Sequence, residues 1–402
     1  MEKAFREIAW HTGSISGEIL EVLLIGTGGV GTVIARHLSS SSRVDKLQLA
    51  DIDLAQAERV AKRTGKKKVE PIRLDAGNPA EIANALRGKG LVINSSLPRF
   101  NVGIMNAALE EGANYIDLAS TEDPDEQYHF SEAWKKRGTT AILGLGEDPG
   151  ISNITAMYAA NRLDRVDSVK IRDGETAESR KYPFVCLFSP ATFIKETMEM
   201  PAIFRNGKLH RISKFSDREI YNFPGGIGRL PVYSVNHEEV YSLSKTISKG
   251  IKYVDFKLAL TDDTRKYLDV LDSLGFTSEE KIQVGGVEVR PMDVTLKLIP
   301  QPAQLGSDIT GKAIILVEVT GRKKGKKVKH VLYAVLDHKY CYRKYGVTAT
   351  SYLTGTGAAA GALQLLEDDH ISPGVYPPEH LNPDRYFEIL RDLDVRMVHR
   401  TS

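Results

Sequence analysis

Glycines at regular spacing form the first group of residues in this sequence that could bind a ligand. The apolar run 21–25 leads directly into Gly-x-Gly-x-x-Gly. Gly26 would turn the chain off a strand, Gly28 would let the backbone approach a pyrophosphate, and Gly31 would let a helix pack against a sheet. The N-terminus of that helix offers free N–H groups and a partial positive charge to phosphates. The motif therefore predicts a dinucleotide site, with these residues binding the cofactor: Gly26, Gly28, Gly29, Val30 and Gly31.

A carboxylate follows the glycines at the distance that such a site requires. The short predicted strand 46–50 ends at Asp51, 20 positions after Gly31, where a carboxylate can bind a ribose 2′-hydroxyl. Its charge would repel the 2′-phosphate of NADP, so Asp51, with Ile52 beside it, favours NAD over NADP. Asp53 could share this role or could cap the next helix.

Further carboxylates follow two later predicted strands, in segments 119–123 and 146–150. Such a gathering is unusual beside a phosphate ligand and more natural beside an amine. Asp148 is a candidate catalytic acid or base, although it could equally be the N-cap of the helix that opens after it. Glu122 and Asp123 likewise could be functional groups or only turn and cap residues.

Histidine and arginine supply the remaining candidates for catalysis and substrate binding. His237 could act as an acid or base, or it could be a polar histidine with satisfied hydrogen bonds. The run 237–239 lacks the second histidine of a metalloprotease helix, so we expect no metal site. Arg99, Lys339 and Arg343 could pair with a substrate carboxylate.

The elements that must position these residues alternate between strand and helix up to about residue 160. Strands are predicted at 21–25, 46–50, 69–74, 91–94, 115–118 and 140–143, and helices at 30–38, 54–64, 80–87, 102–111, 127–137 and 151–160. This rhythm predicts one doubly wound parallel sheet, in which ligands lie beyond the carboxyl ends of the strands. Further cofactor contacts are therefore expected at Asp75, Ala76, Ser95, Ser96 and Leu97.

The pattern changes past residue 163 and predicts a mixed, largely antiparallel sheet with helices. Strands are expected at 166–172, 203–212, 251–260, 282–289, 313–320 and 328–336, and helices at 192–198, 264–274 and 292–299. The dipeptides Asn206-Gly207 and Gly285-Gly286 mark hairpin turns. The basic run 322–329 is interpreted as a solvated hairpin tip rather than a nucleic-acid site.

The last part of the chain contains a helical run at 348–366 that is crowded with Ala and Gly. Small residues imply close packing on another element, and we expect the chain to return there to the first domain. Residues 373–378 are predicted to be a rigid loop, and 386–393 a final helix.

Composition narrows the class of protein. The 402 residues include 54 Lys and Arg against 52 Asp and Glu, a formal net charge of +2. This balance gives no sign of a nucleic-acid or anionic membrane partner. Cys186 and Cys341 are too few for a disulfide framework, and residues 1–17 lack the apolar run of a signal peptide. A cytoplasmic protein is the expectation.

Several stretches resemble the saccharopine dehydrogenase-like family, in particular its carboxynorspermidine (carboxyspermidine) dehydrogenase and lysine 6-dehydrogenase branches. The matching stretches are 91–98, 141–153, 220–224, 237–239, 337–343, 351–355 and 373–375. The resemblance implies a Rossmann domain, a second α/β domain that binds substrate and supports a homodimer, and a C-terminal helix that packs back on the first domain. We accordingly expect domains at 18–163 and 164–346 and a returning segment at 347–402.

The resemblance also implies hydride transfer at a carbon bonded to nitrogen, in an amino acid or an amine derived from one. It implies that Asp148 and Glu122 bind or protonate the amine, that His237 transfers a proton, and that Arg343 holds a substrate carboxylate. Asp123 and Tyr182 complete the expected substrate contacts.

The two branches remain open alternatives. Segments 148–150 and 337–343 resemble the carboxynorspermidine branch, whereas Asp51 and segment 375–379 resemble the NAD-using lysine branch. The sequence thus predicts an NAD(P)-dependent dehydrogenase acting on a C–N bond, with L-lysine 6-dehydrogenase as one alternative. The second alternative is a non-catalytic NAD-binding sensor, because a fold alone does not establish catalysis.

Overall fold

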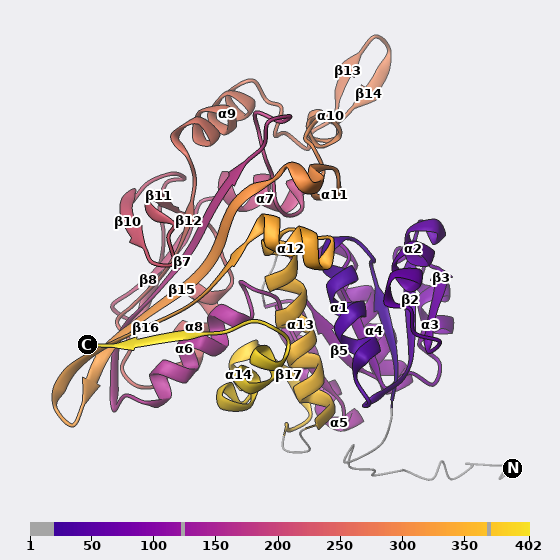
Figure 1. Ribbon diagram of the computed structural model, residues 1–402, viewed down its shortest axis with the longest axis horizontal. Coiled ribbons are helices and arrows are strands. Elements are labelled where there is room, and N and C mark those ends of the chain that lie inside the picture. The colour runs from indigo at the N-terminus through magenta and orange to yellow at the C-terminus, as the bar shows by residue number, and fades with distance from the viewer. Residues whose placement is uncertain (1–19, 122–124, 368–370) are drawn as a thin grey trace, which may run out of the picture.

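The computed structural model describes residues 20–121, 125–367 and 371–402. Its first sheet has seven parallel strands (Figure 1). In spatial order its strands are β17 (Gly374–Tyr376), β6 (Thr140–Ile142), β5 (Asn114–Asp117), β4 (Leu91–Asn94), β1 (Leu20–Ile25), β2 (Val44–Asp51) and β3 (Val69–Arg73). The order of connection reverses between β1 and β4, so a crevice is expected at the carboxyl ends of these two strands. The predicted doubly wound sheet is confirmed.

Alternation of side chains along β1 explains why helices cover both faces of this sheet. Val22 and Leu24 belong to the apolar cluster of one face, whereas Leu23 and Ile25 belong to that of the other. The first face is covered by α1 (Gly29–Ser40), α2 (Leu54–Thr64) and α13 (Ala349–Glu367). Helix α6 (Ile151–Asn161) packs instead on β7 (Arg165–Glu178) and β15 (Thr310–Lys323) of the second sheet. The second is covered by α3 (Pro79–Leu86), α4 (Asn101–Glu111) and α5 (Ser131–Arg137), with the short helices η1 (Pro98–Phe100) and η2 (Gln127–Phe130) nearby.

A second sheet of nine strands is mixed, as predicted. Its main path runs β10 (Glu219–Phe223), β11 (Gly228–Ser234), β12 (Tyr253–Ala259), β7 (Arg165–Glu178), β15 (Thr310–Lys323), β16 (Lys326–Asp337) and β18 (Val398–Thr401), while β8 (Ala202–Arg205) pairs with β12 and with β9 (Lys208–Arg211). Only the β12–β7 pairing on this path is parallel among the described strands.

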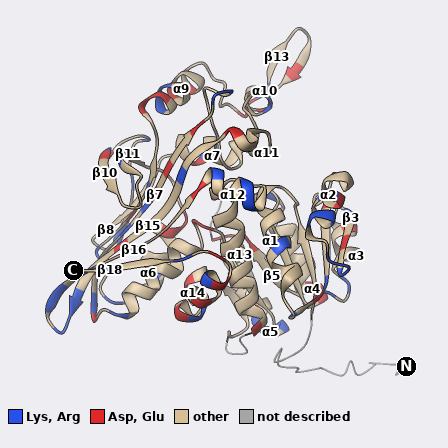
Figure 2. Ribbon diagram, viewed as in Figure 1, with Lys and Arg blue, Asp and Glu red and all other residues tan. Residues whose placement is uncertain are grey.

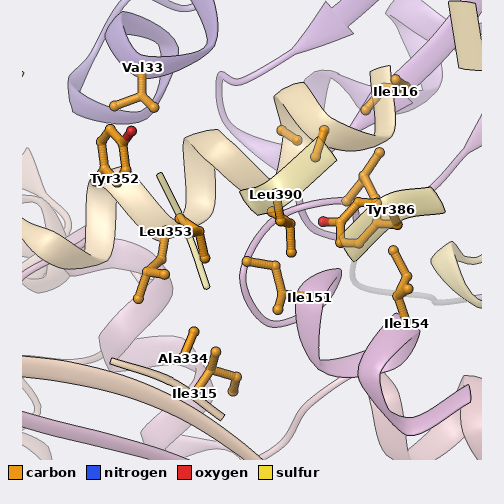
Figure 3. Packing of buried hydrophobic residues seen from close by; sticks show 14 of the residues in the cluster. Val33, Ile116, Ile151, Ile154, Ile315, Ala334, Tyr352, Leu353, Tyr386 and Leu390 are labelled. Atoms are coloured by element: carbon orange, nitrogen blue, oxygen red, sulfur yellow. The ribbon is translucent and has the colours of Figure 1, made fainter. Parts of the chain in front are cut away.

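Helix α13 lies between the two sheets and joins them through one continuous apolar core (Figure 3). Leu353 of α13 packs in the same cluster as Val33 of α1 and Ile315 of β15. Added Cβ atoms at Gly355 and Gly357 would come within 2.6 Å of a Val33 side-chain atom and 2.1 Å of a backbone oxygen. The small residues predicted to allow close packing therefore do so.

The remaining helices surround the second sheet or extend from it. They are α7 (Pro190–Met198), α8 (Glu239–Thr246), α9 (Asp262–Ser273), α10 (Pro291–Leu298), α11 (Pro302–Leu305), η3 (Gly306–Asp308), α12 (His338–Tyr345), η4 (Pro378–His380) and α14 (Pro383–Asp392). The ribbon of β13 (Ile282–Val284) and β14 (Val287–Val289) projects away from the body of the molecule (Figure 1).

The structure corrects several expectations about the elements. Residues 374–376, predicted as part of a loop, form a seventh strand because they pair in parallel with β6. Hairpin 282–289 forms a separate two-stranded ribbon rather than part of the second sheet. Strand β7 continues six residues beyond the predicted end at Arg172, to Glu178. Elements β10, β11, α8 and α12 were not predicted.

The C-terminal segment contacts both sheets rather than the first alone. Strand β17 joins the first sheet, and β18 pairs with β16 of the second. The expected return of the chain to the first domain is thus observed, with an additional strand that ties the two parts together. The exact domain boundaries at 163 and 346 stay predictions.

The basic run and the helices can both be compared with the expectations from the sequence. The basic run 322–329 forms the tip of the β15–β16 hairpin, where Figure 2 shows blue ribbon at the end of the two strands. Lys324 and Gly325 both have positive φ, 50° and 76°, as a tight hairpin turn requires. Across the described ranges, none of the helices combines the length and the apolar character needed to cross a membrane.

Candidate functional site

The glycine loop between β1 and α1 has the close backbone approaches predicted for it. Gly26 has φ of 91°, and a Cβ there would lie 2.7 Å from the carbonyl oxygen of Ser95. A Cβ on Gly31 would lie 2.0 Å from the oxygen of Gly26, so only glycine lets α1 start this close to the loop. At Gly28, by contrast, a Cβ would meet nothing within 4 Å. The backbone at Gly28 is therefore open to a ligand.

Asp51 supports this loop from the end of β2. Its carboxylate accepts hydrogen bonds from the backbone N and the hydroxyl of Thr27, at 2.8 and 2.7 Å, and from the N–H of Asp53 at 3.0 Å. Asp53 itself is the N-cap of α2 and accepts from Ala55. Of the two roles left open for Asp53, the capping role is the one observed.

A cavity of about 590 Å³ runs from the glycine loop along the carboxyl ends of the parallel strands. The expected cofactor residues that line it are Gly26, Gly28, Val30, Asp51, Ile52, Asp75, Ala76, Ser95, Ser96 and Leu97. Gly29 and Gly31 do not line it, because Gly31 packs on the loop and Gly29 lies against Ser351 of α13. Open backbone at Gly28, a carboxylate at a ribose position and a helix N-terminus without a side-chain cap all fit a dinucleotide.

The far end of the same cavity is lined by Asp148, Asp173, Glu196 and His237. Each comes from a different element: the loop before α6, strand β7, helix α7 and the segment before α8. The nucleotide groove and this carboxyl-rich end form one continuous space.

Asp148 is a cavity residue and not a helix cap. The N-cap position of α6 is Gly150, whose N–H donates to Asn153. Burial, followed by the negative charges of Asp173 and Glu147, raises the pKa of Asp148 well above its ordinary range. Removal from water and the neighbouring negative charges both disfavour the ionised form of this carboxyl group.

The neighbouring carboxyl groups are perturbed in the same direction. Burial raises the pKa of Asp173 to about 7 and that of Glu196 to about 8. Glu175, two residues along β7, is half-buried, and desolvation with the charge of Asp173 raises its pKa to about 8. A set of carboxyl groups that titrate near neutrality in a cleft suits the binding and deprotonation of a cationic amine.

His237 is the cationic group among these carboxyls. Its Nδ1 is hydrogen-bonded to Glu239, and its ring stacks on Phe256 at 3.8 Å and 6°. Burial alone would lower the pKa of His237, but the charges of Glu239, Glu196 and Glu238 outweigh burial and raise the pKa to about 10. The imidazole is therefore protonated at neutral pH.

His237, Glu238 and Glu239 have potential metal-ligand atoms within 4.8 Å of one another. Glu239 is bonded to His237 and to Ser152, and Glu238 accepts from the N–H and hydroxyl of Ser120. These bonds occupy Nδ1 of His237, both oxygens of Glu239 and one oxygen of Glu238. The expectation of no metal stays a prediction.

A second cavity of about 520 Å³ adjoins the substrate end and shares Arg99, Glu196 and His237 with the first. The lining of both cavities includes one arginine in common, Arg99, which is exposed on η1 and stacks on Phe100 with 4.8 Å from its guanidinium carbon to the ring centre. Within the described part of the chain Arg99 makes no ion pair with a carboxylate. It is thus free to bind an anionic group of a ligand.

The structure does not bring all of the expected site residues to the cleft. Arg343 is exposed on α12, and Tyr182 packs beside Leu187 and Leu305 in a small apolar cluster; neither lines a described cavity. The substrate-binding roles of Arg343 and Tyr182 stay predictions. Glu122 and Asp123 lie outside the described residues.

Sequence reasoning missed Asp173, Glu175, Glu196 and Glu239. A signal existed for the first two, because carboxylates at i and i+2 in a strand share one face. The predicted strand ended at Arg172, immediately before them. No comparable signal marks Glu196, which belongs to α7, a helix whose Phe193 and Ile194 are buried in the main apolar cluster.

Models of two protein families match this chain. Residues 22–142 match the saccharopine dehydrogenase NADP binding domain, and residues 146–398 match the saccharopine dehydrogenase C-terminal domain.

Two curated proteins are similar over nearly their whole length. A carboxyaminopropylagmatine dehydrogenase of Synechocystis sp. is 29% identical over 383 residues, which cover 93% of this chain and 96% of that protein. A carboxynorspermidine synthase of Vibrio cholerae is 28% identical over 395 residues, which cover 92% and 94%.

Among solved structures, apo saccharopine dehydrogenase (L-Glu forming) from Saccharomyces cerevisiae is similar with a TM-score of 0.74. The match covers 95% of this chain and 100% of that chain at 14% identity. At this identity the likeness concerns the fold.

Proposed function

Because this chain belongs to the saccharopine dehydrogenase family and uses a nicotinamide cofactor, we propose that it transfers a hydride at a C–N bond of a carboxylated polyamine. One observation carries the proposal: the dinucleotide groove continues without a break into a pocket lined by Asp148, Asp173, Glu196 and His237. A nicotinamide that follows the groove reaches this pocket, where carboxyl groups suit a cationic nitrogen.

The substrate class rests on the charge of the two adjoining cavities. Beyond the reacting end, the second cavity adds carboxylates and fewer cations to its lining: Glu126, Glu199, Glu238, Glu279 and Asp293, with Lys195 and Arg290. A chain with more than one cationic nitrogen therefore finds carboxylate partners along it. The relatives named for carboxyaminopropylagmatine and carboxynorspermidine support this class. L-Lysine 6-dehydrogenase is the alternative within the family, supported by Asp51 at the ribose position.

Each side chain has a part in this proposal. The cofactor, when bound, gives or accepts the hydride. Asp148 and Glu196 bind the substrate nitrogen and exchange protons with it. The pKa of Glu196 is about 8, which allows both protonation states near neutrality, and burial raises the pKa of Asp148 in the same direction. Arg99 takes the carboxylate role first expected of Arg343, since it lines both cavities. His237 supplies a proton at the reacting nitrogen.

For the cofactor we propose NAD rather than NADP. Asp51 lines the groove at the ribose position, and Arg99 is the single Lys or Arg among the described residues that line this cavity. No cation in that lining stands near Asp51 to neutralise a 2′-phosphate. A non-catalytic sensor is disfavoured because it has no use for perturbed carboxyl groups at the nicotinamide end.

The homodimer expected from the family resemblance is retained as a proposal. Analytical ultracentrifugation of the purified protein tests it through a sedimenting mass of one or two copies.

The function is tested by following NADH absorbance with carboxynorspermidine, saccharopine, L-lysine and L-glutamate. We expect oxidation of the carboxylated polyamine with NAD, and a loss of about 100-fold or more in kcat for Asp148→Asn with NADH affinity retained. Oxidation of L-lysine alone would select the alternative. If no amine is oxidised with either NAD or NADP, the proposal fails and the non-catalytic NAD-binding sensor becomes the better interpretation.

A further inference from the structure

We propose that Glu239, held in place by Ser152, is a positioning residue that orients the imidazole of His237 with its Nε2 toward the substrate end of the cleft. The proton transfer in this inference rests on the proposed function. The contacts between Glu239, Ser152 and His237 do not depend on which amine is the substrate.

Three contacts fix the ring of His237. Nδ1 bonds one oxygen of Glu239, and the stack on Phe256, with ring centres 3.8 Å apart and planes 6° apart, sets the plane of the imidazole. Because Nδ1 is occupied, the ring nitrogen left for a ligand is Nε2. His237 lines both adjoining cavities. A bond at Nδ1 and a stacked face together leave the ring one orientation.

Glu239 acts through His237 and does not touch the ligand space. Its side chain is fully buried and lines none of the described cavities. His237 is its one basic partner in the described chain, and its second oxygen accepts a 2.6 Å hydrogen bond from the hydroxyl of Ser152. Burying an unpaired carboxylate costs free energy of folding. Glu239 is paired with His237, and we infer that orienting this histidine is its role.

Ser152 connects this pair to the segment that carries Asp148. Its N–H donates to the carbonyl of Glu147 at 3.0 Å, and the next residue, Asn153, donates to Ser242 of α8 at 3.1 Å. Two hydrogen bonds thus join the start of α6 to the start and middle of α8. The segments that precede these helices and carry Asp148 and His237 are thereby linked.

The charged groups that face His237 come from several elements. Glu238 and Glu239 belong to its own segment and the start of α8, Glu196 to α7 and Asp173 to β7, and all of them interact with the imidazole. With so many carboxyl groups around it, the ring carries a proton on each nitrogen at neutral pH.

An oriented imidazolium has a specific use in this reaction. In the reductive direction, Nε2–H gives its proton to the imine nitrogen, the carbon of the C=N bond accepts the hydride of NADH, and a secondary amine and NAD form. His237 becomes neutral while Glu239 stays anionic. In the oxidative direction Nε2 accepts the proton only when His237 is neutral, which its pKa of about 10 places at high pH.

The first test measures the ring itself and needs no turnover. The full-length protein is labelled with 15N-histidine, and the signal of His237 among the 10 histidines is assigned by its loss in His237→Gln. In Glu239→Gln we expect the titration of His237 to move to lower pH and the Nδ1 shift to lose its hydrogen-bonded value. Glu238→Gln is the matched control, because it removes a charge 3.7 Å from Nδ1 without removing the bond. We expect a smaller displacement there and an unchanged Nδ1 shift.

The second test is a double-mutant cycle on kcat. We expect Glu239→Gln to lower kcat about 10- to 100-fold in the wild-type background and to have little further effect in His237→Gln. Ser152→Ala, which removes one bond of Glu239, should shift the His237 titration in the same direction by less. Ser152→Ala also tests the proposal if Glu239→Gln fails to fold.

An unchanged His237 spectrum in folded Glu239→Gln, or an equal loss of kcat in both backgrounds, would overturn the proposal. If the wild-type protein oxidises no amine while the spectral change is present, the proposed function has failed and the positioning role has not.

Discussion

At the scale of single residues, protonation decides what His237 and its carboxyl neighbours can do. A histidine with a pKa near 10 is a poor base at pH 7, whereas carboxyl groups with pKa values of about 7 and 8, such as Asp173 and Glu196, can accept a proton from an ammonium group. The site thus reverses the ordinary order of the two side-chain types. A substrate amine is expected to lose its proton to a carboxylate.

The cofactor preference is tested at Asp51. Replacing it with serine removes the charge that opposes a 2′-phosphate, and adding Ile52→Arg supplies a cation at the exposed neighbouring position. We expect the ratio of kcat/KM for NAD to that for NADP to fall by about 10-fold or more in the double variant. The measurement is initial rate against each cofactor.

The Thr27 bonds of Asp51 make a control necessary, because its loss also loosens the glycine loop. Asp51→Asn removes the charge but keeps the shape of the side chain, and its amide oxygen can still accept from Thr27. The ratio should therefore fall in this variant as well, with less disturbance of the loop. A wild-type enzyme that already prefers NADP would contradict the argument from Asp51.

Arg99 is the residue at which the carboxylate of the substrate is tested. We expect Arg99→Ala to raise KM for a carboxylated polyamine about 10- to 100-fold, since a charge-assisted bond to a carboxylate is lost. The same variant should change KM little for an analogue without the carboxylate. Arg343→Ala, an exposed arginine outside the cleft, is the matched control and should behave as wild type. Equal effects on both ligands would remove Arg99 from this role.

At the scale of elements, the sequence identified those whose pattern is local. Helix α2 and strand β4 have the predicted bounds, because a capped amphipathic helix and a short buried strand between turns carry their own signals. Local signals were not enough to predict the carboxyl groups of the candidate site. Asp173 and Glu175 lie on an extension of β7 that forms because β15 pairs with it along its whole length. Such pairing cannot be predicted from the sequence of one segment.

The same reason explains β17. Three residues between Pro373 and Pro377 have no periodicity of their own, and the edge of β6 makes them a strand. Most residues that line the groove beside the glycine loop, by contrast, could be predicted, because a dinucleotide fold repeats one arrangement of turn, glycine and strand end. The carboxyl-rich end depends on how α7 and α8 pack over the second sheet.

Helix α13 offers a test of how packing controls the site. A Cβ on Gly357 would lie 2.1 Å from the backbone oxygen of Gly146, in the loop that carries Asp148. Gly357→Ala therefore must displace this loop, and we expect a loss of about 1–3 kcal/mol in the free energy of unfolding together with a fall in kcat. Denaturant titration and steady-state rates measure the two effects. Gly103→Ala in α4, where the added Cβ meets nothing within 4 Å, is the matched control and should be neutral or stabilising.

At the scale of the whole molecule, the two sheets share one core, and the cleft lies where they meet. Strands from both sheets enter the same apolar cluster, with α13 between them (Figure 3). The carboxyl groups of the substrate end come from both sides of this junction. Their protonation is therefore linked to the folding of the molecule as a unit.

This linkage predicts how stability depends on pH. The native chain holds protons on Asp173, Glu175 and Glu196 up to about pH 7 to 8, whereas the unfolded chain releases them near the ordinary values of 3.8 and 4.5. His237 acts with the same sign, since its pKa rises from 6.5 to about 10. The native state binds more protons than the unfolded state between these limits, so the free energy of unfolding falls as pH rises.

We therefore expect stability to decrease from pH 6.5 to 8.5, by about 1.4 kcal/mol per pH unit for each proton held by the native state alone. Urea titrations at several pH values measure the slope, and Glu196→Gln, which cannot titrate, should make it shallower. A cationic polyamine should also flatten it, because an ammonium group in the cleft stabilises the ionised carboxylates that high pH produces. A stability that is constant or rises over this range would show that the carboxyl groups are ionised in the native cleft, and that a cationic substrate is not required to balance them.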